Sequence, residues 1–210
     1  MDRIEEYKRI RERLVAIHGE ILGFLNKEDI FKVAKDLGVV ENRAIVFESE
    51  LEREALMDFT IYREGPSGKS KIAEYIESNE KARKEENLLR AMVTSETSLY
   101  EVTNVNRKNK TIKFEDVLNG LGTFTVVDLN MSETIDVNAL VFTRLIHLDD
   151  FSITSGLIFN FRQEHREYLQ RISRKRMKKV EAENDSDKRL IAFLKIYRRD
   201  GIPFMLREVR

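Results

Sequence analysis

The fold of this chain is decided by the stretch 99-LYEVTNVNRKNKTIKFEDV-117, in which two runs of strand-forming residues flank a polar turn. The first run ends at Val105. The second, 111–117, alternates apolar with polar side chains, as a half-buried strand does. The turn between them, 106–110, contains no apolar residue. The pattern therefore predicts a β-hairpin over 99–117.

Three further strands are predicted downstream of this hairpin. The dipeptide Asn119-Gly120 marks a tight turn before a strand-forming run at 123–127. The ranges 140–148 and 151–161 form a second hairpin around an Asp-Asp turn. Five short strands joined by tight turns predict a small antiparallel β-module, either barrel-like or a strongly curved five-stranded sheet.

The regions on both sides of this β-module are predicted to be helical. Apolar residues recur at steps of three and four over 4–24, 27–37 and 51–62, and again beyond 162. The fold class is therefore α+β, with N-terminal helices (1–94), the central β-module (95–161) and C-terminal helices (162–210). No low-complexity linker separates these regions, and the apolar tail 202–206 is expected to dock. The three regions could thus equally form one integrated domain.

Composition excludes several classes of protein. Charged residues make up 35% of the chain, above the usual level of about 25%, but the formal net charge is zero. No global charge therefore attracts nucleic acid or a membrane. The chain has no cysteine, so it has no disulfide and no thiolate ligand. It also has no apolar run of about 20 residues. A cytoplasmic protein that makes no membrane contact is expected.

No catalytic, cofactor or metal motif withstands inspection. The string 65-GPSGKS-70 ends like a phosphate-binding loop, but Arg63 occupies the position of the required upstream glycine and a helical pattern precedes the string. The three histidines, at 18, 147 and 165, have no partner at a metal-ligand spacing. We therefore predict no catalytic, cofactor-binding or metal-binding residues and no cofactor, and an enzyme is the less favoured interpretation.

One run of charge exceeds the background. The segment 162–179 carries eight basic residues against Glu164 and Glu167, and 171–179 contains no acid. An acidic neighbour is expected to offset such like-charge spacing. That neighbour is an acidic face of this protein, a nucleic acid (the minority interpretation) or a protein partner. The leading interpretation is that the run is solvated or paired within the protein. The candidate contacts are Arg166, Arg171, Arg174, Lys175, Lys178 and Lys179.

The apolar stripe of helix 4–24 is narrow and close to a heptad seam. It predicts packing on the rest of the chain, and its alternative is a contact in a homodimer. Three heptads of one sequence do not decide between the two.

Several strings resemble an uncharacterised prokaryotic domain family that often lies upstream of the zinc-binding SEC-C motif. They are 35-KDLG-38, 46-VFESE-50, 56-LMDF-59, 98-SLYEV-102, 115-EDVLNG-120 and 142-FTRLI-146. The SEC-C tail uses cysteines, so that motif is absent here and its zinc does not carry over. The resemblance implies that the N-terminal helices and the β-module belong together, and it implies no chemistry.

Three charged residues, Asp58, Asp116 and Arg144, stand inside otherwise apolar blocks of the sequence. A buried charge needs a partner, so two of the three are expected to pair where the helices meet the sheet.

Together these patterns favour a non-enzymatic binding or interaction protein of unknown function, which contacts an acidic partner through 162–179. The alternative is an enzyme or small-ligand binder with a pocket between the helices and the β-module.

Overall fold

The computed structural model describes residues 2–79 and 85–202, and it is an α+β protein. In the N-terminal region the elements are α1 (Arg3–Gly23), α2 (Lys27–Leu37), β1 (Val40–Glu41), β2 (Ala44–Ile45), α3 (Glu50–Tyr62), α4 (Lys71–Ser78) and α5 (Glu86–Val93). The central elements are β3 (Glu96–Asn106), β4 (Thr111–Asp116), β5 (Thr123–Val127), α6 (Met131–Thr134), β6 (Leu140–His147) and β7 (Ser152–Phe161). A short 3-10 turn leads into α7 (Arg166–Met177), and α8 (Asp185–Asp200) follows.

The five long strands form one strongly curved sheet with the order β3-β4-β5-β7-β6, and β6 pairs back onto β3. Four of the five pairings are antiparallel. The fifth, β5 with β7, is parallel and consists of the single pair Val126↔Ser152. The ring is therefore joined at one point and is otherwise open between β5 and β7. The curved five-stranded module predicted from the sequence is confirmed, although one of its pairings is parallel.

The connectivity of this module is that of a Greek key. Strands β3, β4 and β5 follow one another, and β6 returns to lie beside β3, which gives the spatial order 4-1-2-3. A five-stranded, partly open Greek-key barrel is the architecture of the OB-fold. We refer to β3–β7 below as the barrel.

The barrel interior is a separate apolar core. It contains Tyr100, Phe114, Val126, Val141 and Leu145, all at most 3% exposed, together with Met131 and Ile135 from the α6 region. The Tyr100 and Phe114 rings stack with their centroids 5.5 Å apart.

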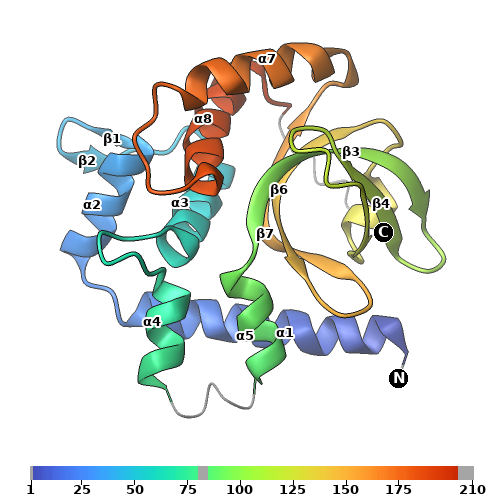
Figure 1. Ribbon diagram of the computed structural model, residues 1–210, viewed down its shortest axis with the longest axis horizontal. Helices are drawn as coiled ribbons and strands as arrows, with labels where there is room; N and C mark the ends of the chain where they lie inside the picture. Colours follow the sequence, from blue (N-terminus) through green and yellow to red (C-terminus); the bar gives the residue numbers. More distant parts are fainter. Residues whose placement is uncertain (1, 80–84, 203–210) are drawn as a thin grey trace.

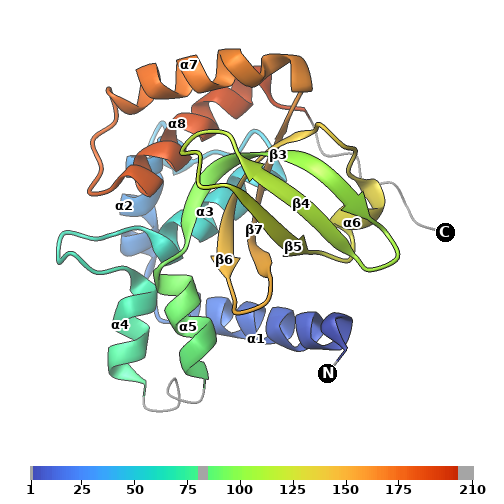
Figure 2. The same ribbon diagram turned by 45° about the vertical axis from the view of Figure 1, so that its right-hand side comes forward.

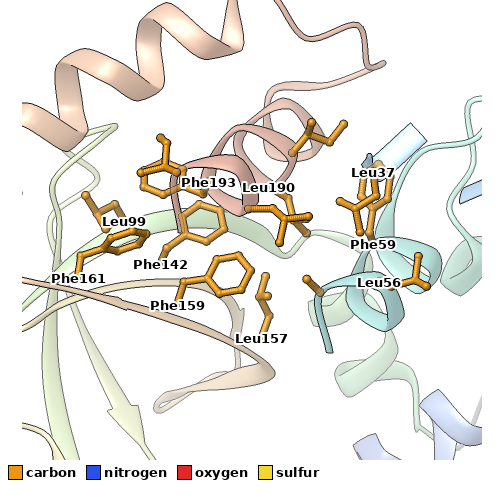
Figure 3. Packing of buried hydrophobic residues seen from close by; sticks show 14 of the residues in the cluster. Leu37, Leu56, Phe59, Leu99, Phe142, Leu157, Phe159, Phe161, Leu190 and Phe193 are labelled. Atoms are coloured by element: carbon orange, nitrogen blue, oxygen red, sulfur yellow. The ribbon is translucent and has the colours of Figure 1, made fainter. Parts of the chain in front are cut away.

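Helices cover the other side of β6 and β7, so both faces of these strands are buried. Figure 1 shows α7 above the barrel, α2, α3 and α8 beside it, and α1, α4 and α5 below it. The largest core lies between the barrel and α2, α3 and α8 (Figure 3). There Phe142 of β6 stacks on Phe193 of α8 with ring centroids 4.2 Å apart. The hydrophobic core is thus shared by the helices and the barrel.

The third core lies under α1. Its apolar stripe, Tyr7, Leu14, Ile17 and Ile21, is at most 7% exposed and packs with α4, α5 and the barrel. These four side chains are covered by this chain itself and are unavailable to a second copy.

Two sequence-based boundaries shift in the structure. The basic segment 162–179 is helical only over Arg166–Met177, so Arg162 lies before α7 and Lys178 and Lys179 follow its last turn. Of the tail 202–206, only Ile202 lies within the described residues, and its amide donates to Asn160 O at 2.9 Å.

Candidate functional site

A buried ion pair joins the barrel to the helices. Arg144 Nε, on β6, lies 3.0 Å from Asp58 Oδ1, on α3, and the two side chains are only 2% and 3% exposed. Ser155 of β7 donates to Asp58 Oδ2 at 2.5 Å, and Arg144 Nη1 donates to Ser95 O at 2.9 Å. Buried charges are tolerated when they are paired and hydrogen-bonded in this way. The pair fixes α3, β6 and β7 to one another.

Two uncharged rings complete the surroundings of this pair. The Arg144 guanidinium lies 4.4 Å above the centre of the Tyr62 ring, and the Tyr62 hydroxyl shares a 2.8 Å hydrogen bond with His18 Nε2. Burial raises the pKa of Tyr62 and lowers the pKa of His18 to about 4. Both side chains are therefore neutral at pH 7, so neither adds a charge to the junction.

Asp116 lies apart from this pair. Its Oδ1 accepts hydrogen bonds from Ser98 Oγ at 2.7 Å and from the Asn119 backbone amide at 3.1 Å. The side chain is buried and holds the turn that follows β4. Of the three charged residues singled out in the sequence, the structure therefore brings Asp58 and Arg144 together and leaves Asp116 with polar partners.

Sequence reasoning missed Asp187, in the first turn of α8. It is 2% exposed and accepts hydrogen bonds from the Glu64 amide at 3.1 Å and from Asn184 Nδ2 at 3.2 Å. Burial raises the pKa of Asp187 to about 6. The Asn184–Asp187 spacing is typical of a helix N-terminus, but nothing in the sequence shows that this terminus is buried.

The basic segment is largely exposed. We define the α7 basic surface by its five exposed basic side chains, Arg171, Arg174, Lys175, Lys178 and Lys179. None of these five forms an ion pair with another residue of 2–79 or 85–202. Arg166, predicted with them, instead pairs with Glu101 of β3, with Nε and Oε2 2.8 Å apart. Within the described residues, Arg166 therefore has an ion-pair partner in the same chain, whereas the other five predicted cations have none.

The helix dipole accounts for part of this surface. Cations in the last turn of a helix are stabilised by about 0.3–1 kcal/mol each. Arg174 and Lys175 lie in the last turn of α7. Arg171 lies before that turn and Lys179 lies beyond the helix, so the dipole does not explain the whole set.

The outer face of β3–β5 is uncovered (Figure 2). We define it by the outward residues Thr103, Asn104, Lys113, Glu115, Thr123 and Thr125, of which all but the half-buried Thr125 are exposed. Lys113 Nζ donates to Thr125 Oγ1 at 2.6 Å. Phe124 lies on the same strand but contacts the interior ring of Tyr100, with centroids 6.2 Å apart. None of these six outward positions holds an aromatic side chain.

A groove of about 730 Å³ lies between α1, α5 and the β6–β7 turn. Its floor includes apolar side chains such as Ile10, Leu88 and Phe151. Its charged lining is mainly acidic, with six carboxylates against Arg9 and Arg13. These carboxylates are Glu6, Glu12, Glu85, Glu86, Asp149 and Asp150. Arg13 pairs with Glu85 at 3.0 Å. The groove thus has a negative charge and joins segments that are distant in the sequence.

The loop 65–70 connects α3 to α4 and does not follow a strand. Its Ser70 side chain caps α4 by accepting from the Ala73 amide at 3.3 Å, and Lys69 pairs with Glu77 at 2.6 Å. Both polar groups thus have partners inside the chain.

Among residues 2–79 and 85–202, no group of three or more His, Asp or Glu side chains is placed to hold a metal ion. Over the same residues, no helix combines the length and the apolar character that crossing a membrane requires.

The fold and these surfaces define an α+β protein with an OB-like barrel set among helices, one exposed basic helix and an acidic groove. The chain belongs to the family of unknown function DUF7986, whose family model matches residues 1–207. No curated protein and no solved structure matches this chain. The link to a SEC-C motif and a prokaryotic source stay predictions.

Proposed function

We propose that this chain is a non-enzymatic binding protein that takes an acidic partner on the α7 basic surface. The observation that carries the proposal is the set of five exposed basic side chains with no ion-pair partner among the described residues. The protein's net charge is zero, so cations left unpaired at one place mark a local asymmetry.

The surroundings of α7 support a fixed binding surface. Leu169 of α7 is fully buried in the core shared with α8 and the barrel. The Tyr168 hydroxyl donates to Asp200 Oδ2 at 2.9 Å. The helix therefore presents its cations from a rigid position, which lowers the entropic cost of binding. We propose further that the helical regions and the barrel act as one unit.

The test is retention on heparin, a polyanion, compared between the wild type and the triple variant Arg174→Gln, Lys175→Gln, Lys178→Gln. We expect the variant to elute at lower salt, because it makes fewer contacts with the sulfate groups. Each lost contact of this kind reduces the slope of log K against log salt concentration by about one. Absorbance at 260 nm of the purified wild type shows whether nucleic acid accompanies it.

The matched control removes three exposed lysines on α2 and α8, in the variant Lys32→Gln, Lys35→Gln, Lys195→Gln. It carries the same change in net charge at another place on the molecule. If the control and the α7 variant elute together, retention depends on total charge and the proposal is wrong.

A second candidate function rests on the acidic groove, which lies between helices and barrel and has the volume of a small-molecule site. Its charge fits a cationic ligand. Spermidine is a suitable probe, and it should raise the Tm of the wild type but not that of Asp149→Asn, Asp150→Asn. An equal shift in both proteins would eliminate this candidate.

A further inference from the structure

The outer face of β3–β5 adjoins the start of α7, and the two are fixed to each other. The Arg166–Glu101 ion pair links the start of α7 to β3. One turn later, the Gln170 side-chain amide donates to the Val117 carbonyl just after β4. A ligand that lies on α7 can therefore continue onto the barrel without crossing a mobile joint.

A second group of cations lies at the far end of this face. The turn between β3 and β4 carries Arg107 and Lys108, both exposed and without an ion pair within the described residues. Lys110, in the same turn, is bound to Glu133 and is not counted. Free cations thus lie along α7 and at the far turn of the β3–β4 hairpin, and the outer face of β3–β5 lies between that turn and the start of α7.

The surface between the two groups has a different chemistry. Its six outward residues are mostly neutral hydrogen-bonding side chains, with the charges Lys113 and Glu115 close to each other on β4. Glu101 of β3, which pairs with Arg166, lies opposite Glu115 on the same face. A ligand that fits must carry negative charge where it meets α7 and the 107–110 turn, and must offer hydrogen-bonding groups between them. Such a ligand must also be long. Three turns of α7 and half of β3 together span roughly 35 Å.

We propose that this surface binds single-stranded nucleic acid, with the strand running from α7 across the outer face of β3–β5 to the 107–110 turn. This inference rests on the proposed function and names its partner. A single strand offers phosphates and also exposes the hydrogen-bonding edges of its bases, which a duplex hides. A site of this length holds on the order of 4–16 nucleotides.

The six outward positions of the β3–β5 face hold no aromatic side chain, and this determines where the binding affinity can come from. Stacking on aromatic rings supplies about 1–3 kcal/mol per base in many single-strand binders. This face has no such ring, so its affinity comes from phosphate contacts and polar contacts. Binding is therefore tolerant of sequence and falls steeply with salt.

The experiment measures fluorescence anisotropy with labelled single strands of 6 and 20 nucleotides and with a 20-base-pair duplex. The variants are Arg107→Glu, Lys108→Glu at the far turn and Arg174→Glu, Lys175→Glu on α7. The matched control is Lys32→Glu, Lys35→Glu on α2. Circular dichroism confirms that each variant is folded, and Arg107→Gln, Lys108→Gln replaces the first variant if it is not.

We expect the far-turn variant to bind the 20-nucleotide strand at least 10-fold more weakly and the 6-nucleotide strand within 2-fold of the wild type. The α7 variant should weaken both, and the control neither. Wild-type affinity for the 20-nucleotide strand should exceed that for the duplex.

Three outcomes overturn the inference. If the far-turn variant binds the long strand like the wild type, the path across the barrel is wrong and α7 binding still stands. If the duplex binds more tightly, the single-strand assignment is wrong. If the wild type is retained by heparin but binds no strand, the acidic partner is not a nucleic acid; if heparin retention is also absent, the proposed function itself fails.

Discussion

Arginine occurs in opposite surroundings in two regions of this molecule. At the junction between helices and barrel, Arg144 is 2% exposed and pairs with Asp58. On α7, Arg174 is exposed and has no ion-pair partner within the described residues. Burying the Arg144 charge costs desolvation free energy, which its ion-pair and hydrogen-bond partners offset. The Arg174 charge stays in water, so it has almost no such cost. The junction charges therefore hold the structure, and the α7 charges remain available for binding.

The largest expected effect comes from breaking the junction pair. We expect Asp58→Ala to reduce the free energy of unfolding by about 3–5 kcal/mol, because it leaves the Arg144 charge buried without its partner. Urea denaturation followed by circular dichroism measures this loss. The double variant Asp58→Leu, Arg144→Met, which removes both charges, should lose less. A loss below about 1 kcal/mol in the single variant would show that the pair is not structural.

The next effect concerns the separate carboxylate of the barrel. We expect Asp116→Ala to cost about 1–3 kcal/mol, because the Ser98 hydroxyl and the amides of the following turn lose their acceptor. Its neighbour Glu115 is exposed, and Glu115→Ala should change stability by no more than about 0.5 kcal/mol. If both variants lost the same free energy of unfolding, the hydrogen bonds of the buried Asp116 carboxylate would not be what stabilises this turn.

A smaller effect depends on pH. The pKa of Asp187 is raised to about 6 by burial, so the folded protein takes up this proton before the unfolded chain does. The wild type should therefore gain stability relative to Asp187→Asn as the pH falls from 7 to 5, by about 1 kcal/mol. Urea midpoints at the two pH values test this. A constant difference between the two proteins would mean that Asp187 does not titrate in this range.

The smallest effect on stability is expected on α7. Arg174→Gln should change the free energy of unfolding by no more than about 0.5 kcal/mol, since the side chain is solvated and unpaired. Thermal unfolding of this single variant at low and high salt is the measurement. A loss of several kcal/mol would place Arg174 with the junction charges and would weaken the case for binding.

Much of the fold was predictable from local patterns. The alternation of residues 111–117 and the turn residues around them predicted the first hairpin, and the steps of three and four in α1 and α2 predicted those helices. These signals are local, because the period of side-chain burial follows from the geometry of a single element. The parallel pair Val126↔Ser152 was not predictable in this way, since it joins residues 26 positions apart through closure of the sheet.

The candidate surfaces were predictable only in part. The basic run 162–179 is visible as a charge pattern, but its division into the paired Arg166 and the free cations depends on where β3 places Glu101. Ser155 and Asp187 carried no signal at all, because a small polar residue gives no indication of burial until its neighbours are known.

By itself, the sequence determined the α+β class, the five strands and the basic segment, because propensity, periodicity and charge act over a few residues. Only the tertiary structure decided which charges pair and which stay free. Pairing depends on distances between elements that are far apart in the chain, and the strength of a charge–charge interaction depends on whether water is excluded around it. Asp58 and Arg144, 86 positions apart, meet only because α3 packs against the barrel.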